Sequence, residues 1–321
     1  MKEEIKKLKK IELHVHLDGS VSIPLASTLL GIKEENLKKE MVASTKCHDL
    51  KEYLEKFTLP LSFMQTKKNL KLIAIDLVNQ LSMDNVIYAE IRFAPCLHTK
   101  NGLTQEEVVE AVLEGLKTNQ KVKTNLIVCL MRGVKNEDNL KTIEVASKYL
   151  NKGVCALDLA GDEKKYKLKG YKELFLLAKK KHIPFTIHAG EVDEEDLKEA
   201  IFLGVKRIGH GVKCINDKNL VSLLLEKNIL LEVCPTSNIQ TNAFSTLTDH
   251  PIYDLYKEKI NISINTDNRT VSNTNLNQEY LNLIQNFPFQ IEDFVTMNLN
   301  SIHYTFLSSE EKSKLLEMFR R

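Results

Sequence analysis

The chain has 321 residues with a formal net charge of +2 at pH 7, and 27% of the residues are charged. This near balance leaves no electrostatic basis for binding nucleic acid. The hydrophobic fraction of 43% is enough for a substantial core. The length suits one large domain or two small ones, and an α/β barrel by itself can occupy it.

Six cysteines lie along the chain without a Cys-x-x-Cys pair or dense spacing. This distribution argues against a disulfide framework and against a thiolate zinc finger, and reduced thiols fit a reducing compartment. The N-terminal segment has no signal-peptide apolar region, and no apolar run approaches the length of a membrane span. The sequence therefore predicts a soluble, cytoplasmic protein without a membrane partner.

Eight short runs rich in Ile, Val, Leu or aromatic residues predict strands. In chain order they are residues 11–16, 86–94, 125–132, 154–160, 184–189, 207–210, 229–234 and 260–266. Helical patterns separate most of them, at residues 137–150, 171–181, 194–203, 216–227 and 251–259. A further helix, reaching Leu116, opens with a capping box from Thr104 to Glu107.

The alternation of strands and helices predicts parallel strands. Eight repeats predict closure into a (β/α)8 barrel formed by one domain over residues 1–321, with functional groups at the carboxyl ends of the strands. A doubly wound open sheet is the alternative fold. It is the weaker one because no Gly-x-Gly-x-x-Gly motif follows a strand.

A long insertion without a strand, about residues 20–85, follows the first predicted strand. Within residues 50–64, four apolar side chains recur at helical spacing: Tyr53, Leu54, Phe57 and Leu61. One interpretation is a helix packed on the barrel. The other is a lid over the barrel mouth that shields a flat apolar ligand. The segment from Asn277 onward is predicted to be mostly helical and carries no recognisable chemistry.

Two histidines one residue apart, His14 and His16, occupy the first predicted strand. Alternate residues of a strand point to the same face, so both imidazoles leave one side. Two neutral imidazoles held together are half of a metal site. By itself, such a pair is as often structural as it is metal-binding.

Further chemically active residues stand where other predicted strands end: His188 and Glu191, His210, and Asp267. A third imidazole and a carboxylate would complete the shell of a first-row metal, zinc above all, with water in an open position. Glu191 follows His188 by three residues at the mouth of the same strand, which suits an acid or a base. The other histidines, His48, His98, His182, His250 and His303, lack strand-end partners and are predicted to be exposed or structural.

Together these motifs resemble the adenosine deaminase family of metal-dependent amidohydrolases. The matching text occurs in the family's order at residues 14–19 (HVHLDG), 157–163 (LDLAGDE), 188–191 (HAGE), 209–211 (GHG), 234–238 (CPTSN) and 266–268 (TDN). The resemblance implies one zinc ion held by four residues, namely His14, His16, His188 and Asp267. It also implies hydrolytic deamination of adenosine, and of 2′-deoxyadenosine, to inosine or 2′-deoxyinosine with release of ammonia.

The same resemblance implies the substrate contacts. Glu191 would face purine N1 and His210 the metal-bound water. Gly161 would present its backbone to N3, and Asp18 with His16 would meet the ribose 5′-hydroxyl. The residue after the metal carboxylate, often aspartate in the family, is Asn268 here, so its contact with N7 is a departure from the pattern.

Several alternatives stay open. His210 could be a turn histidine, Gly161 could be needed only for the bend after strand four, Asp18 could cap the next segment, and Asn268 could satisfy a loop turn. A binuclear site is disfavoured because residues 155–161 contain no lysine. Nucleic-acid and cytidine deaminases use His-x-Glu with Pro-Cys-x-x-Cys, which is absent. Adenine deaminases resemble this chain but tend to carry glutamate in place of Asp18, and the shorter carboxylate leaves room for a ribose. A nucleoside-binding or structural zinc protein without catalysis is the third alternative.

Overall fold

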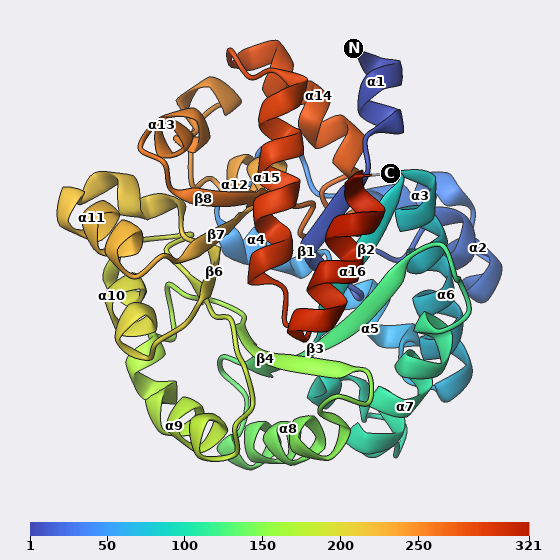
Figure 1. Cartoon of the computed structure of the whole chain (residues 1–321). Coiled ribbons are helices and arrows are strands. Elements are labelled where there is room, and N and C mark those ends of the chain that lie inside the picture. The colour runs from blue at the N-terminus through green and yellow to red at the C-terminus, as the bar shows by residue number, and fades with distance from the viewer. Residues whose placement is uncertain (321) are drawn as a thin grey trace.

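Eight parallel strands alternate with helices in the computed structural model, which describes residues 1–320 (Figure 1). The strands are β1 (Lys10–His16), β2 (Val86–Phe93), β3 (Lys123–Met131), β4 (Val154–Ala160), β5 (His188–Ala189), β6 (Arg207–His210), β7 (Leu230–Val233) and β8 (Asn261–Ile264). They form two parallel sheets in the orders β1-β2-β3-β4 and β5-β6-β7-β8. Parallel bridges between Val15 and Asp267 and between Leu157 and Phe185 join the sheets at both seams. The predicted α/β barrel is confirmed.

The outer helices surround the strands, as Figure 1 shows. They are α6 (Lys67–Met83), α7 (Gln105–Leu116), α8 (Asn136–Tyr149), α9 (Lys172–Lys180), α10 (Glu195–Phe202), α11 (Lys218–Glu226) and α13 (Ile252–Lys257). The predicted capping box is present at Thr104 and Glu107. The shorter elements are α1 (Lys2–Lys7), α12 (Pro235–Gln240), η1 (Pro95–His98), η2 (Leu168–Tyr171), η3 (Val212–Asn216) and η4 (Leu247–Asp249). Across the described residues, every helix is too short or too polar to traverse a bilayer.

Two predicted strands are at least three residues shorter in the structure. The run at 184–189 pairs regularly only at β5, because Pro184 has no N–H to donate and Phe185 makes a single bridge. The run at 260–266 ends at Ile264 because a side chain replaces backbone pairing where β8 meets β1. Asn265 Oδ1 accepts a hydrogen bond of 2.9 Å from the backbone N–H of Leu13.

The C-terminal segment is helical, as predicted: α14 (Leu276–Asn286), α15 (Ile291–Tyr304) and α16 (Ser309–Arg320). It covers the end of the barrel where β1 and β2 begin. Leu307 and Leu315 pack there in one cluster with Ile11 and Tyr88, and the N–H of Phe306 donates to Glu90. The opposite end of the barrel stays available for a site.

The insertion after β1 contains helices and no strand, as predicted: α2 (Ile23–Leu30), α3 (Glu34–Met41), α4 (Leu50–Glu55), α5 (Thr58–Phe63) and α6. The helix expected over residues 50–64 is two short helices, broken at Lys56 and Phe57. Pro60 lies in the first turn of α5, and in one continuous helix its ring would clash with the carbonyl of Lys56.

The barrel interior holds a network of fully buried charges that the sequence analysis did not anticipate. Arg92 donates hydrogen bonds of 2.8 Å to both Asp158 and Glu232. Arg207 donates to the other oxygen of Glu232 at 2.7 Å and also pairs with Glu90. Buried charges are tolerated when they are paired and hydrogen-bonded. This network is in contact with the histidines at the carboxyl ends of the strands.

Candidate metal centre and active site

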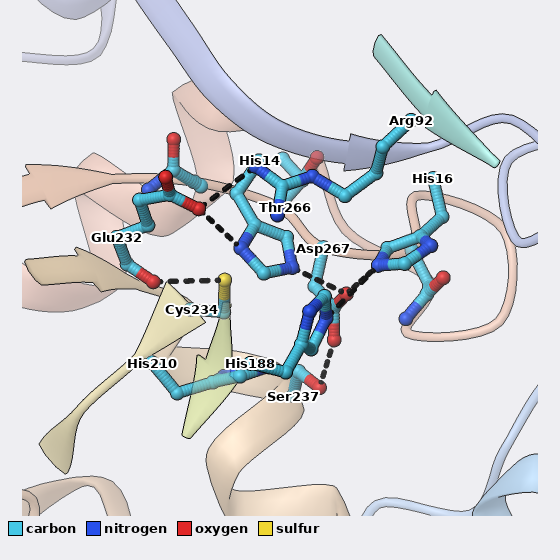
Figure 2. Close-up of polar contacts among 12 residues, drawn as sticks. His14, His16, Arg92, His188, His210, Glu232, Cys234, Ser237, Thr266 and Asp267 are labelled. Atoms are coloured by element: carbon cyan, nitrogen blue, oxygen red, sulfur yellow. Dashed lines mark hydrogen bonds and ion pairs between the residues drawn. The ribbon is translucent and has the colours of Figure 1, made fainter. Parts of the chain in front are cut away.

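The strand-end residues singled out by the sequence converge on one point (Figure 2). One ligand atom from each of His14, His188, His210 and Asp267 lies within 4.8 Å of the others. His16 faces the same centre, since its Nε2 lies 3.2 Å from His188 Nε2 and 3.4 Å from Asp267 Oδ1. All five side chains are buried. The structure therefore brings together residues that are up to about 250 positions apart in the sequence.

The outer atoms of the candidate ligands are engaged by the protein. His14 Nδ1 lies 2.9 Å from Glu232 Oε2, and His14 Nε2 is buried without a hydrogen-bond partner. His188 Nδ1 lies 2.8 Å from Asp158 Oδ2. Such carboxylate partners fix the tautomer and the ring orientation of metal-binding histidines. The Nε2 atoms of His14 and His188 are therefore available to bind a metal.

Asp267 completes the donor set. Its Oδ2 accepts a hydrogen bond of 2.6 Å from Ser237, while Oδ1 faces His14 and His16 at 3.3 and 3.4 Å. Burial opposes ionisation of this carboxyl, but the contact with His14 and the electrostatic attraction of the surrounding imidazoles hold its pKa below the usual range. Neutral imidazoles with one carboxylate are a typical zinc donor set. The residues present fit one zinc ion.

Glu191 and His210 face each other beside this cluster. Glu191 Oε2 lies 3.7 Å from His210 Nε2, and its other oxygen accepts a hydrogen bond of 3.0 Å from Thr241. Burial, reinforced by the charge of Asp267, raises the pKa of Glu191 to about 7. Burial lowers the pKa of His210 to about 4. Near neutral pH, a carboxyl able to carry a proton therefore stands opposite an uncharged imidazole.

A cavity of about 210 Å³ opens above the cluster, and every predicted site residue except His14 lines it. The polar part of its wall consists of His16, Asp18, Gly161, His188, Glu191, His210, Asp267 and Asn268. The apolar part includes five residues of the 50–64 segment, namely Leu50, Tyr53, Leu54, Phe57 and Leu61. Among the described residues, no lysine or arginine lines this cavity.

The structure answers some of the alternatives left open. Asp18 does not cap the following helix, because Ser22 is the N-cap of α2. Instead, Asp18 Oδ1 is buried without a hydrogen-bond partner, 4.0 Å from His16 Nδ1. Gly161 lines the cavity and also has a φ of +107°, which favours glycine, so the bend and the binding surface coincide. His210 too has a positive φ, 63°, at the end of its strand.

Asn268 lines the cavity and donates from Nδ2 to the hydroxyl of Tyr53 at 3.0 Å. Its backbone also closes a local turn, since the N–H of Ser272 donates to its carbonyl at 2.8 Å. Asn268 therefore lies on the cavity wall and also takes part in a local turn. His98, predicted to be exposed or structural, is fully buried, and its Nε2 lies 4.0 Å from Asp18 Oδ2.

Sequence reasoning missed the residues that orient the site. A charged residue inside an apolar strand run, such as Arg92 or Glu232, was the sequence feature that could have identified them. The motif at 234–238 was given no role in the site. It supplies Ser237 to Asp267, and Asn238 Nδ2 lies 3.1 Å from His210 Nδ1.

Comparison with known proteins agrees with this geometry. The family model described as adenosine deaminase matches residues 9–320. An adenosine deaminase of Clostridium perfringens is 41% identical over 96% of this chain and 97% of its own length. The N6-methyl-AMP deaminase of Arabidopsis thaliana has a TM-score of 0.88 at 26% identity, covering 100% of this chain and 98% of its own. An adenine deaminase of Arthrobacter aurescens has a TM-score of 0.87 at 25% identity, covering 98% of both chains. The chain belongs to the adenosine deaminase family.

Proposed function

We propose that this protein is a zinc-dependent adenosine deaminase. It converts adenosine and 2′-deoxyadenosine to inosine and 2′-deoxyinosine, with release of ammonia. The observation that carries the proposal is the pairing of Glu191 with His210, 3.7 Å apart on the wall of the cavity beside the metal-binding cluster. A protein that only bound a nucleoside or only needed structural zinc would require neither group.

The zinc ligands in this proposal are His14, His16, His188 and Asp267. His16 is preferred to His210 as the fourth ligand because its Nε2 lies within 3.4 Å of both His188 and Asp267 atoms. His210 instead faces Glu191. Zinc bound there would supply a water whose pKa falls from about 15.7 to about 7.

Glu191 is the proton donor to purine N1. A carboxyl with a pKa of about 7 carries a proton for much of the time at neutral pH and can still release it. Thr241 holds one oxygen of Glu191 and leaves the other facing the reacting centre. Protonation at N1 draws electrons from C6, so that addition of water there and loss of ammonia yield the 6-oxo purine.

His210 accepts the proton that the attacking water gives up. Its Nε2 faces the centre, and its pKa of about 4 keeps it unprotonated at neutral pH. Asn238 contacts its other nitrogen and fixes the ring.

The nucleoside is bound by the polar wall of the cavity. Asp18 with His16 receives the 5′-hydroxyl, the backbone of Gly161 faces N3, and Asn268 donates to N7. Helices α4 and α5 and the turn between them form a lid within the insertion at 20–85, which is supported by the five apolar residues that this segment contributes to the wall. The carboxylate of Asp18, whose Oδ1 is unpartnered, disfavours a 5′-phosphate because no lysine or arginine among the described residues lines the cavity.

The experiment is an assay of ammonia release from adenosine, 2′-deoxyadenosine, adenine and AMP at equal concentrations. Adenosine is expected to be used at least about 10-fold better than adenine or AMP, the factor that one charge-assisted hydrogen bond supplies. Preference for adenine or AMP would contradict the nucleoside assignment. Absence of ammonia release from all four compounds would contradict the proposal that the protein is a deaminase.

We also propose that the chain forms a single domain and that the protein is cytoplasmic. The cytoplasmic location is supported by the six free cysteines.

A further inference from the structure

The hydroxyl of Tyr53 is a polar group on an otherwise apolar part of the cavity wall. Within residues 50–64, the other side chains that line the cavity are leucines and Phe57. Only 1% of Tyr53 is exposed, so its hydroxyl needs partners inside the protein. Its two shortest hydrogen bonds are with the loop after β8: Ser272 Oγ at 2.7 Å and Asn268 Nδ2 at 3.0 Å.

When Tyr53 Oη donates its hydrogen to Ser272 Oγ, it can only accept from Asn268, and these contacts determine which edge of the Asn268 amide is available. One hydrogen of Nδ2 goes to Tyr53. The amide oxygen is buried without a hydrogen-bond partner and packs against Gly19, where a Cβ would come within 1.9 Å of it. The second Nδ2 hydrogen is therefore the polar group that this amide keeps for a ligand in the cavity.

We propose that Tyr53 is a specificity-determining positioning residue that acts through Asn268. Its hydroxyl holds the amide with the N–H edge toward the cavity, so that the site selects bases with a hydrogen-bond acceptor at purine N7. The inference rests on the proposed function, in which Asn268 meets N7. A carbonyl turned toward N7 would set two acceptors against each other, so the orientation of the amide matters as much as its presence.

The hydroxyl of Tyr53 contacts Asp267, the proposed metal ligand, only through Ser237. Ser237 Oγ lies 3.5 Å from Tyr53 Oη but donates to Asp267 at 2.6 Å. The bond to Asp267 stays when the hydroxyl of Tyr53 is removed. We therefore expect Tyr53→Phe to keep its zinc, which separates the effect on the base from an effect on the metal.

The test uses the zinc-loaded full chain and two unreactive ligands, inosine and its analogue with N7 replaced by C–H. Their dissociation constants are measured by titration calorimetry for wild type and Tyr53→Phe. Loss of one neutral hydrogen bond should raise the dissociation constant of inosine by about 3- to 10-fold. The analogue, which offers no acceptor to the amide, should change by less than about 2-fold.

Tyr280→Phe is the matched control. Tyr280 is also 1% exposed, and its hydroxyl accepts a hydrogen bond of 2.9 Å from Asn298 Nδ2, but neither residue lines the cavity. This variant should lose about as much thermal stability as Tyr53→Phe and bind inosine like wild type. Equal weakening of inosine by both variants would show a general loss of structure and would overturn the inference.

A second variant tests the route through the amide. In an Asn268→Ala background, Tyr53→Phe should cause less than about a 2-fold further loss of inosine binding, because residues that act as a unit are not additive. Full additivity, or equal weakening of inosine and its N7-lacking analogue, would overturn the inference. If wild type neither deaminates adenosine nor binds inosine, the proposed function itself fails, and that result is separate from the outcomes above.

Discussion

His14 and Glu232 form a fully buried pair in which Nδ1 lies 2.9 Å from Oε2. Burial opposes the charge of Glu232, but Arg92 and Arg207 hold the pKa of this carboxyl below its usual range, so it is an acceptor. His14 Nδ1 must then carry the proton, which leaves Nε2 as the metal-facing lone pair. The charge network inside the barrel thereby selects the tautomer that a metal needs.

Glu232→Gln should weaken zinc binding by about 10- to 100-fold, the usual cost of losing an outer partner of a metal-binding histidine. The measurement is competition with a chromophoric chelator. Glu90→Gln is the control, because Glu90 is equally buried and also pairs with Arg207 but contacts no histidine of the site. Equal losses in both variants would mean that Glu232 acts through stability and not through His14.

Metal analysis of the purified protein should give a stoichiometry near one zinc per chain. The physical reason is that the described residues form one donor cluster at the strand ends, and residues 155–161 of β4 and its end contain no lysine to bridge a second ion. Asp267→Ala should lower the zinc content, since it removes the only carboxylate of the proposed ligand set. Two tightly bound ions, or undiminished zinc in that variant, would contradict the assignment.

Glu191→Gln should keep its zinc and lose about 10²- to 10⁴-fold in kcat, because the amide cannot deliver a proton to N1. Zinc content and kcat are measured on the same preparation. Thr241→Val leaves the carboxyl in place and should lose much less. A near-normal rate for Glu191→Gln would exclude this residue as the proton donor.

The activity should fall as the pH rises through about 7. The protonated form of Glu191 is the active one, and burial raises its pKa to about 7. The hydrogen bond from Thr241 lowers that pKa, so Thr241→Val should move the falling limb of kcat/KM to higher pH. The pH profile of kcat/KM for both proteins checks the sign. A limb that moves to lower pH in the variant would contradict this assignment.

Asp18→Ala should damage turnover of adenosine far more than any residual turnover of adenine. A hydrogen bond to a charged group contributes about 1.5–3 kcal/mol, which corresponds to about 10- to 150-fold in kcat/KM. Steady-state kinetics with both substrates measure the difference. Asp18→Asn keeps the shape and should lose less. Parallel losses on both substrates would place Asp18 away from the ribose.

His98 shows where a residue outside the motifs entered the site. Its Nδ1 contacts the carbonyl of Met64 at 3.0 Å, and its Nε2 stands 4.0 Å from Asp18. No local pattern predicts this position, because it depends on how the residue after α5 packs against η1. A residue's distance from the motif in the sequence was a poor guide to its distance in space.

The sequence by itself determined the barrel and the position of its chemistry. Strand and helix periods are local, and the carboxyl ends of parallel strands share one face, so His14, His188, Glu191, His210 and Asp267 had to meet there. The tertiary structure decided what no local pattern encodes. It set the pairing of buried Arg92 with Asp158 and Glu232, the break of the 50–64 helix at Pro60, and the amide edge that Tyr53 leaves free on Asn268. These features depend on contacts between segments that are distant in the sequence. A buried polar group needs a hydrogen-bond partner, and the tertiary structure decides which partner lies close enough.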